Sequence, residues 1–277
     1  MKYLYTVLIL VFMSQGGATA QEKKSGFFDK VKTTFSSEIK IGTHTFKDGS
    51  VYTGEMKGRK PNGKGKTVFK NGNVYEGEYV KGKREGYGTY TFPDGEKYEG
   101  QWFQDQQHGK GIYYFMNNNR YDGMWFQDYQ QGKGTMYYYT GDIYEGDWVN
   151  DKRESQGTYT WKNGSKYEGS WKNDKKEGKG TFVWNDGCKY EGDWKNDVRD
   201  GKGTFEYANG DKYVGNFKDG MQDGKGTFTW ANGAVYEGDW KNNKREGKGI
   251  YKWSNGDVYE GDWKNNRPHG QGSLKTV

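Results

Sequence analysis

The sequence predicts an all-β fold, an elongated array of ten β-hairpins that follow one another every 23 residues. Tyrosine recurs at this interval from Tyr52 to Tyr259 without insertion or deletion. A glycine stands two residues after each of these tyrosines, and an aromatic residue or Met56 stands two residues further on. Alternation with a period of two is the pattern of a β-strand, so each unit begins with a strand that has one aromatic and one polar face.

A second strand is predicted in each unit, after six polar residues that we expect to form a loop. In the run Gly178–Trp184, glycine and aromatic residues share one face, while lysine and threonine lie on the other. The unit closes with a pair such as Asn163-Gly164, where glycine adopts the positive φ of a tight hairpin. One unit has Asn118 in place of this glycine, and Asn tolerates the same conformation best among the other residues.

The composition requires an aromatic core. After residue 10 the only leucine is Leu274, whereas 18% of all residues are Phe, Trp or Tyr. Glycine normally weakens a strand, so its recurrence beside the aromatic positions needs a reason. We expect an aromatic ring from a neighbouring strand to lie over each bare glycine backbone, with glycine and Trp forming one packing unit. Ser155 replaces one such glycine, which predicts a looser local fit.

The region before the repeats has the features of a leader. Residues 1–20 have a basic start, an apolar run and a small-residue end at Ala20, which is the layout of a signal peptide cleaved after that residue. An uncleaved membrane anchor is the alternative, although the apolar run is shorter than the ~20 residues that span a bilayer.

A linker and a short amphipathic helix are predicted for residues 21–42, where apolar side chains follow helical spacing up to a stop at Gly42. We expect this helix to cap the array, and docking to a membrane or a partner is the alternative. Residues 43–51 are predicted to be a leading half-repeat, because Phe46 and Gly49 precede their counterparts in the first full repeat by 23 residues.

The repeats resemble those of the MORN family (membrane occupation and recognition nexus). The segments Tyr190–Trp194 and Gly201–Phe205 match the family's Tyr-Glu-Gly-Glu-Trp and Gly-x-Gly patterns almost residue for residue. The resemblance covers residues 52–277 in ten consecutive units. It implies a single-layer, twisted antiparallel sheet with one hairpin per repeat and an aromatic trough on one face. It also implies a scaffold or tether that binds proteins or lies near a membrane.

Residues suited to catalysis or metal binding are scarce. His108 and His269 occupy a position that other repeats fill with varied polar residues, so we interpret both as loop residues, and we interpret His44 as a packing residue. Cys188 has no second cysteine with which to form a disulfide. The Gly-Lys-Gly-Thr motif at residues 178–181 lacks the spacing of a phosphate loop. The sequence therefore predicts no enzyme activity, no cofactor and no metal.

The distribution of charge matters more than the modest net charge of +6. The predicted loops are basic near the ends of the array, as in Lys57–Lys60, Lys81–Arg84 and Lys244-Arg245, but Gln104–Gln107 carries no basic residue. This interruption and the predicted export argue against nucleic-acid binding. Contact with acidic membrane lipid is expected to be weak.

We expect an exported protein, periplasmic or secreted, that mediates protein–protein interaction. In a one-layer sheet the aromatic face has no second sheet over it, so its rings should be only partly covered and available to a partner. The candidate partner-binding residues lie in the best-matched repeats, and they are Trp171, Trp194, Phe217, Trp240, Trp263, Tyr190 and Tyr236. Glycan or cell-wall binding through the same trough is the alternative function.

Self-association is also expected. The final repeat ends at Lys275–Val277, soon after its second strand, and no later segment covers the backbone groups of that strand. The sequence therefore predicts a homo-oligomer formed through the C-terminal edge of the sheet.

Overall fold

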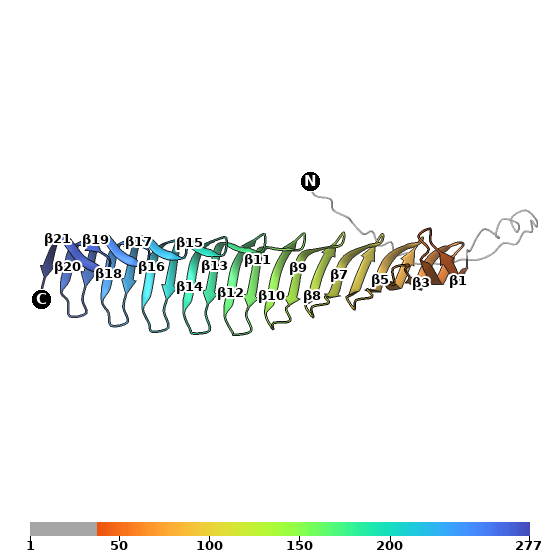
Figure 1. Ribbon diagram of the computed structural model, residues 1–277, viewed down its shortest axis with the longest axis horizontal. Helices are drawn as coiled ribbons and strands as arrows, with labels where there is room; N and C mark the ends of the chain where they lie inside the picture. The colour runs from red at the N-terminus through yellow and green to blue at the C-terminus, as the bar shows by residue number, and fades with distance from the viewer. Residues whose placement is uncertain (1–37) are drawn as a thin grey trace, which may run out of the picture. The chain divides into compact units, whose positions relative to one another are not determined.

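Residues 38–277 are described by the computed structural model and form one continuous β-sheet of 21 strands (Figure 1). This part of the chain contains no helix long and apolar enough to cross a membrane. The predicted all-β, single-layer antiparallel fold is confirmed. The predicted signal peptide and the predicted helix up to residue 37 lie outside the described residues.

The predicted end of the helix is wrong. Residues 39–42 lie in the first strand, β1 (Ile39–Thr45), which pairs antiparallel with the second strand. In this pairing Gly42 lies opposite Gly54. Ile39 and Ile41 are 58% and 76% exposed, so these apolar residues belong to an edge strand and not to the buried face of a helix.

Each repeat contributes a shorter and a longer strand. The shorter strands carry the tyrosine, glycine and Trp pattern, and they are β2 (Val51–Lys57), β4 (Val74–Val80), β6 (Lys97–Phe103), β8 (Arg120–Phe126), β10 (Ile143–Val149), β12 (Lys166–Lys172), β14 (Lys189–Lys195), β16 (Lys212–Lys218), β18 (Val235–Lys241) and β20 (Val258–Lys264). The longer strands carry the Gly-x-Gly run, and they are β3 (Lys60–Val68), β5 (Lys83–Thr91), β7 (Gln106–Tyr114), β9 (Tyr129–Tyr137), β11 (Lys152–Thr160), β13 (Lys175–Val183), β15 (Val198–Glu206), β17 (Met221–Thr229), β19 (Lys244–Lys252) and β21 (Arg267–Lys275).

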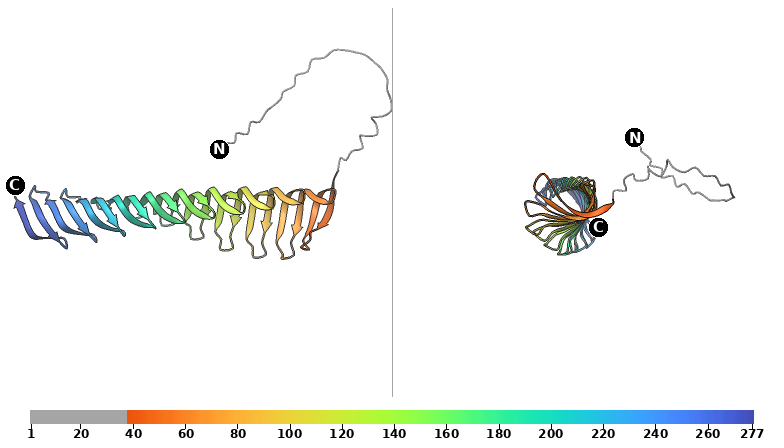
Figure 2. Two further views of the ribbon diagram at one scale, coloured as in Figure 1. Left: turned by 90° about the horizontal axis from the view of Figure 1, so that it is seen from above. Right: turned by 90° about the vertical axis from the view of Figure 1, so that its right-hand side faces the viewer.

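Strands that are consecutive in the chain pair antiparallel, from β1–β2 to β20–β21. The sheet therefore grows in one direction as the chain passes from repeat to repeat (Figure 1). Seen along this direction, the strands fan around a common axis, which is the accumulated twist of the sheet (Figure 2). Each repeat contacts only its neighbours, as in other repeat arrays.

The turn within each repeat is shorter than predicted. In one repeat it consists of Asn173 and Asp174, whose φ angles of 47° and 68° are those of a two-residue type I′ turn. The flanking charged residues continue the strands up to Lys172 and again from Lys175. The predicted six-residue loop is therefore wrong, because Asn and Asp adopt positive φ readily and allow the chain to reverse in two residues.

The turn between repeats has the predicted glycine conformation. Gly164 has a φ of 88°, and its N–H donates to the carbonyl of Trp161 at 2.9 Å. Asn118 takes the same place with a φ of 63°. The prediction that Asn substitutes for glycine in this turn is confirmed.

The core is a line of tyrosine side chains, one per repeat, each packed over a pair of glycines. Tyr167 is 0% exposed, and its ring lies over Gly169 and Gly180, which face each other on neighbouring strands. A Cβ atom at either glycine would overlap the phenol or the opposite backbone. The Tyr167 hydroxyl donates to the carbonyl of Ser170 at 2.9 Å. The bare backbone is required, as predicted, but the ring over it belongs to Tyr and not to Trp.

The Trp side chains fill the spaces between successive tyrosines. Trp171 packs edge to face against Tyr144 and Tyr167, with ring centroids 5.3 and 5.2 Å apart. Its Nε1–H donates to the carbonyl of Gly157 in the preceding repeat at 3.0 Å. The core therefore continues from repeat to repeat within one layer.

The first glycine of each Gly-x-Gly run has a different role. Gly178 lies beside a β-bulge and has a φ of 71°. A Cβ atom there would make only ordinary contact with Ser170. Ser155 adopts a φ of 57° at the equivalent position. Ser155 therefore does not replace a glycine that lies under a ring, so the basis of the predicted looser fit is wrong, and the looser fit itself stays a prediction.

We predict that the protein loses stability in alkali. Burial raises the pKa of Tyr79 to about 12 and raises the pKa of Tyr75 and Tyr98 further. An unfolded tyrosine has a pKa of about 10, so above about pH 10 the folded state binds more protons than the unfolded state. The stabilisation is complete below this pH and is lost as the pH rises towards about 12.

Guanidinium chloride unfolding measured from about pH 8 to pH 11.5 tests this prediction. The unfolding midpoint should stay constant up to about pH 9.5 and then fall steeply. Phenolate absorbance should appear together with the loss of circular dichroism. Ionisation of most tyrosines near pH 10 in a folded protein would contradict the prediction.

Candidate functional site

The predicted partner-binding side chains lie in the core. Their exposed fractions range from 0% to 6%, for Tyr190, Tyr236, Trp263, Trp171, Trp194, Phe217 and Trp240. The expectation that these rings are only partly covered is therefore wrong. Each Trp or Phe of this set packs edge to face against tyrosines of two successive repeats.

A basic side chain from the longer strand covers the core Trp or Phe in several repeats. The Cζ atom of Arg153 lies 4.4 Å from the ring centroid of Trp171. Arg245, which we expected in a loop, lies in β19, and its Cζ atom is 4.5 Å from the ring of Trp263. The basic side chains at this position are Arg84, Arg153, Lys176, Arg199 and Arg245. They cover the ring faces that a second sheet would cover in a sandwich.

A carboxylate also holds two of these arginines. Arg153 Nε lies 3.2 Å from Asp174 Oδ1, and its Nη2 donates to the Asp174 carbonyl at 2.7 Å. Arg84 makes the same contacts with Asp105, at 3.4 and 2.6 Å. We call this arrangement the cation clamp: a cation held between a core Trp and the Asp of the next turn.

A second line of aromatic side chains is half-buried and follows the ends of the longer strands. We call it the aromatic row, and it consists of Phe46, Phe69, Phe92, Phe115, Tyr138, Trp161, Trp184, Tyr207, Trp230 and Trp253. Trp184 packs against Phe182 and against Phe205 of the next repeat, with centroid distances of 4.4 and 5.3 Å. Trp253 is 37% exposed. Residues 38–277 form one layer, so no second sheet within them covers the row.

The aromatic row was missed in the choice of site residues, although its signal is present in the sequence. Trp184 ends the alternating run of the second strand, one step beyond Phe182. That last step falls at the turn, where a ring has neighbours on fewer sides than in mid-strand. Position along the hairpin therefore decides exposure more than the regularity of the pattern does.

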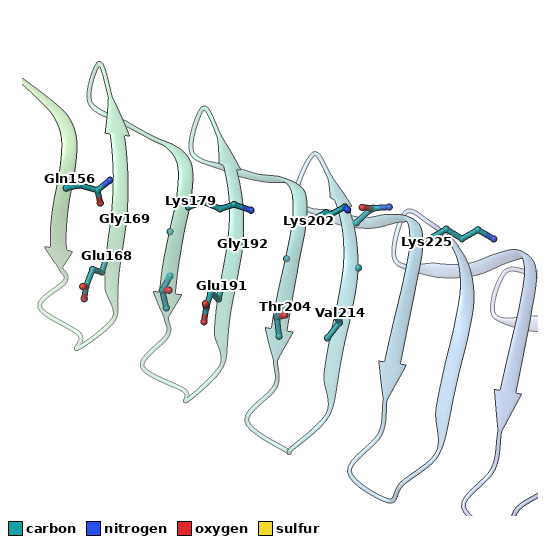
Figure 3. A pocket seen from close by; sticks show the side chains of 15 residues that line it. Gln156, Glu168, Gly169, Lys179, Glu191, Gly192, Lys202, Thr204, Val214 and Lys225 are labelled. Atoms are coloured by element: carbon teal, nitrogen blue, oxygen red, sulfur yellow. The ribbon is translucent and has the colours of Figure 1, made fainter.

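The opposite face carries a polar groove (Figure 3). Its volume is 1020 Å³, its floor includes glycine backbone, and carboxylates such as Glu191 line it together with lysines such as Lys202. Lys179 on this face pairs with Asp193 at 2.7 Å. Charges of both signs alternate here, unlike the continuous basic surfaces that bind nucleic acid or acidic lipid.

Two of the three histidines, His44 and His108, pack against aromatic rings. His108 lies in β7 between Phe103 and Phe126, with centroid distances of 5.6 and 5.2 Å, and His269 lies in β21. Their placement in loops is wrong because the turn is only two residues long. His44 packs against an aromatic ring, as predicted. Among residues 38–277 no cluster of three or more His, Cys, Asp or Glu side chains could hold a metal ion.

The length of the repeat and its hairpin geometry match a known family. The MORN repeat pattern matches ten consecutive segments that run from residue 52 to residue 276. The chain belongs to the MORN repeat family. MORN repeats form scaffolds for interaction with proteins or membranes. No curated protein matches the sequence of this MORN protein.

Several solved structures are similar to this MORN protein over much of its length. One is the TCP10 domain of Danio rerio CPAP in complex with a peptide of Danio rerio STIL. It is 13% identical in sequence, the alignment covers 86% of this chain and 98% of that chain, and the TM-score is 0.45. A second is the SAS-4 (dCPAP) TCP domain of Drosophila melanogaster in complex with a proline rich motif of Ana2 (dSTIL). It is 16% identical in sequence, the alignment covers 69% of this chain and 90% of that chain, and the TM-score is 0.32. A third is virginiamycin B lyase from Staphylococcus aureus, which is 11% identical in sequence. The alignment covers 87% of this chain and 88% of that chain, and the TM-score is 0.17.

Proposed function

We propose that this MORN protein is a non-enzymatic scaffold that binds an extended protein segment along its aromatic row. One observation carries the proposal: half-buried aromatic side chains recur at the same place in successive repeats of a single-layer sheet. Contiguous apolar surface of this kind marks interaction sites, and Trp and Tyr are enriched at binding hot spots.

The row presents a rigid surface to a partner. Trp161, Trp184 and Trp230 each contact an aromatic ring of the next repeat, at centroid distances of 4.9, 5.3 and 5.1 Å. Side chains held in this way lose little conformational entropy on binding. Successive positions of the row are two strands apart, about 10 Å, so a short extended segment reaches two or three of them.

Peptide selection from a random display library on the full chain tests the proposal. We expect the selected peptides to be rich in apolar residues. The double substitution Trp184→Ser and Trp230→Ser should weaken their binding about tenfold or more, because truncating a hot-spot aromatic costs upwards of about 1.4 kcal/mol. Fluorescence anisotropy with labelled peptides measures the affinity.

The matched control is the double substitution Lys179→Ser and Lys225→Ser on the polar face, which should leave the affinity unchanged. An unfolding midpoint measured for every variant separates loss of binding from loss of folding. Peptides that bind the Trp variant as tightly as the parent chain would rule out the aromatic row as their site.

Glycan binding is the second candidate, and the exposure of Trp253 favours it because an exposed indole stacks on sugar rings. Titration with cell-wall polysaccharides, followed by Trp fluorescence, distinguishes the two functions. Saturable quenching of Trp fluorescence that is lost in Trp253→Ser would show that the row binds glycans. If no quenching occurs in the parent chain, a protein segment is the ligand that the proposal retains.

Export is part of the proposal. The layout of residues 1–20 supports cleavage of a leader after Ala20 and a periplasmic or secreted location. A scaffold held in such a location by protein contact needs no span of its own.

Self-association through the C-terminal edge is supported by the exposure of β21. All nine of its residues are exposed, and β20 is its only partner strand among the described residues. Its outer edge offers N–H and C=O groups that a second copy can pair with antiparallel across a twofold axis.

We therefore predict a concentration-dependent dimer in light scattering. Leu274→Glu, at a side chain 62% exposed on β21, should weaken the dimer about tenfold or more because a charged side chain on an edge strand disfavours pairing with another strand. Val183→Glu, at a side chain 39% exposed in mid-array, is the matched control and should have no effect. A monomer at every concentration would show that the edge does not associate.

A further inference from the structure

Two consecutive repeats contain an open form of the cation clamp. At the position that Arg153 occupies in the closed clamp, they carry Gln107 and Gln130. The acidic residues that would hold an arginine are still present as Asp128 and Asp151. Their carboxylates accept the backbone N–H groups of the two glutamines at 2.7 and 2.8 Å. The same bond fixes the carboxylate of the closed clamp.

An open pocket of 480 Å³ lies over these two positions. The two carboxylates line it together with the aromatic rings of Tyr113, Phe115, Trp125, Tyr138 and Trp148, and the paired Arg153 and Asp174 of the next, closed clamp line it as well. Aromatic rings and a carboxylate are also the groups that hold Arg153 in the neighbouring repeat. Arg153 is held by Asp174 and Trp171, so among the described residues no basic side chain lies over Trp125 or Trp148, and the pocket offers rings and acids to a cation from outside.

The two glutamines line this pocket and have no side-chain hydrogen bond among the described residues. Gln107 is 8% exposed and Gln130 is 5% exposed, yet within the described residues only their backbone groups form hydrogen bonds. Both side chains line the open pocket, and an amide oxygen accepts readily from a guanidinium group. The glutamine side chains therefore offer acceptors to a bound arginine.

The glutamine in a later repeat shows what a completed site looks like. Gln222 Nε2 donates to the Tyr207 hydroxyl at 3.2 Å, and the residue that accepts its backbone N–H is the neutral Asn243. This position has no carboxylate, and its amide already donates to a tyrosine hydroxyl. It serves below as a control.

The open clamps also have uncompensated negative charge. Burial and, next, the charge of Asp128 raise the pKa of Tyr98, and burial and, next, Asp151 raise that of Tyr121. In the closed clamp, by contrast, the charge of Arg153 opposes the rise in the pKa of Tyr144. A cation from outside would relieve the same electrostatic cost in the open clamps.

We propose that the open clamps at Gln107 and Gln130 bind two arginine side chains of a partner segment. The inference rests on the proposed function, because it assigns partner chemistry to the face that carries the aromatic row. Each guanidinium takes the place that Arg153 fills in its own repeat, over aromatic rings and beside Asp128 or Asp151.

The spacing of the clamps sets the spacing of the arginines. Corresponding positions in successive repeats are two strands apart, about 9.6 Å. An extended segment in polyproline II geometry rises about 3.1 Å per residue and turns once every three residues, so arginines at i and i+3 lie about 9.3 Å apart on one side. The partner motif is therefore Arg-x-x-Arg.

The test uses the peptide acetyl-Gly-Arg-Gly-Gly-Arg-Gly amide and the full chain, with affinity measured by calorimetry. The double substitution Gln107→Arg and Gln130→Arg gives each clamp its own arginine, as at Arg84. We expect it to weaken peptide binding about tenfold or more, the order of a desolvated cation–π contact. The unfolding midpoint of this variant should equal or exceed that of the parent chain.

The matched control is Gln222→Arg, at the position that faces Asn243, and it should leave the affinity unchanged. An isomeric peptide with adjacent arginines should bind more weakly than Arg-x-x-Arg. Failure of the parent chain to bind the peptide, or equal binding by the parent and the filled-clamp variant, would overturn the inference. Loss of library-peptide binding in the Trp184 and Trp230 variant, with arginine-peptide binding retained, separates the aromatic row from the clamps.

The two proposals therefore fail separately. If library peptides bind the Trp184 and Trp230 variant as tightly as the parent chain, the aromatic row is not their binding site, and the clamp measurement is unaffected. If the arginine peptide binds the Gln107→Arg and Gln130→Arg variant as tightly as the parent chain, the clamps are not its binding site, and the proposal for the aromatic row is unaffected.

Discussion

The structure depends on the packing of one tyrosine ring over two glycines that face each other on neighbouring strands. Where Gly192 meets Gly203, the phenol of Tyr190 occupies the space that two Cβ atoms would take. Its hydroxyl donates to the carbonyl of Asp193 at 2.9 Å, which fixes the bend of the strand around the ring. The same contact recurs every 23 residues, so the register, the curvature and the length of the repeat are set together.

Because this contact fills the space over the glycines, the other aromatic side chains do not have to. Each core Trp lies between two tyrosines, and in several repeats a basic side chain covers its face, as Arg245 covers Trp263. The aromatic row packs against this core and keeps exposed ring surface, as at Trp253, which we propose a partner covers. Where Gln107 stands in place of the covering arginine, Trp125 and Asp128 are still present. We propose that this site binds an arginine of a partner instead.

The sequence predicted the strands, the glycine turns and the aromatic core because period and turn chemistry are local properties. Burial was mispredicted because it depends on what crosses from the next repeat: Trp194 reads as exposed in a one-layer sheet, but Lys176 lies over its ring. Arg245 reads as a loop residue until the turn is known to contain two residues. The clamps required distances between repeats, which no pattern within one repeat supplies.

The most direct test of the central contact is the free energy of unfolding of Gly192→Ala compared with that of Glu191→Ala, its neighbour on the polar face. A Cβ atom at Gly192 meets backbone atoms of Gly203 and Lys202, which cannot move aside, so we expect a loss of about 3 kcal/mol or more. Glu191 makes only an exposed ion pair with Lys189, so its replacement should cost less than about 1 kcal/mol. Equal losses in the two variants would contradict the account.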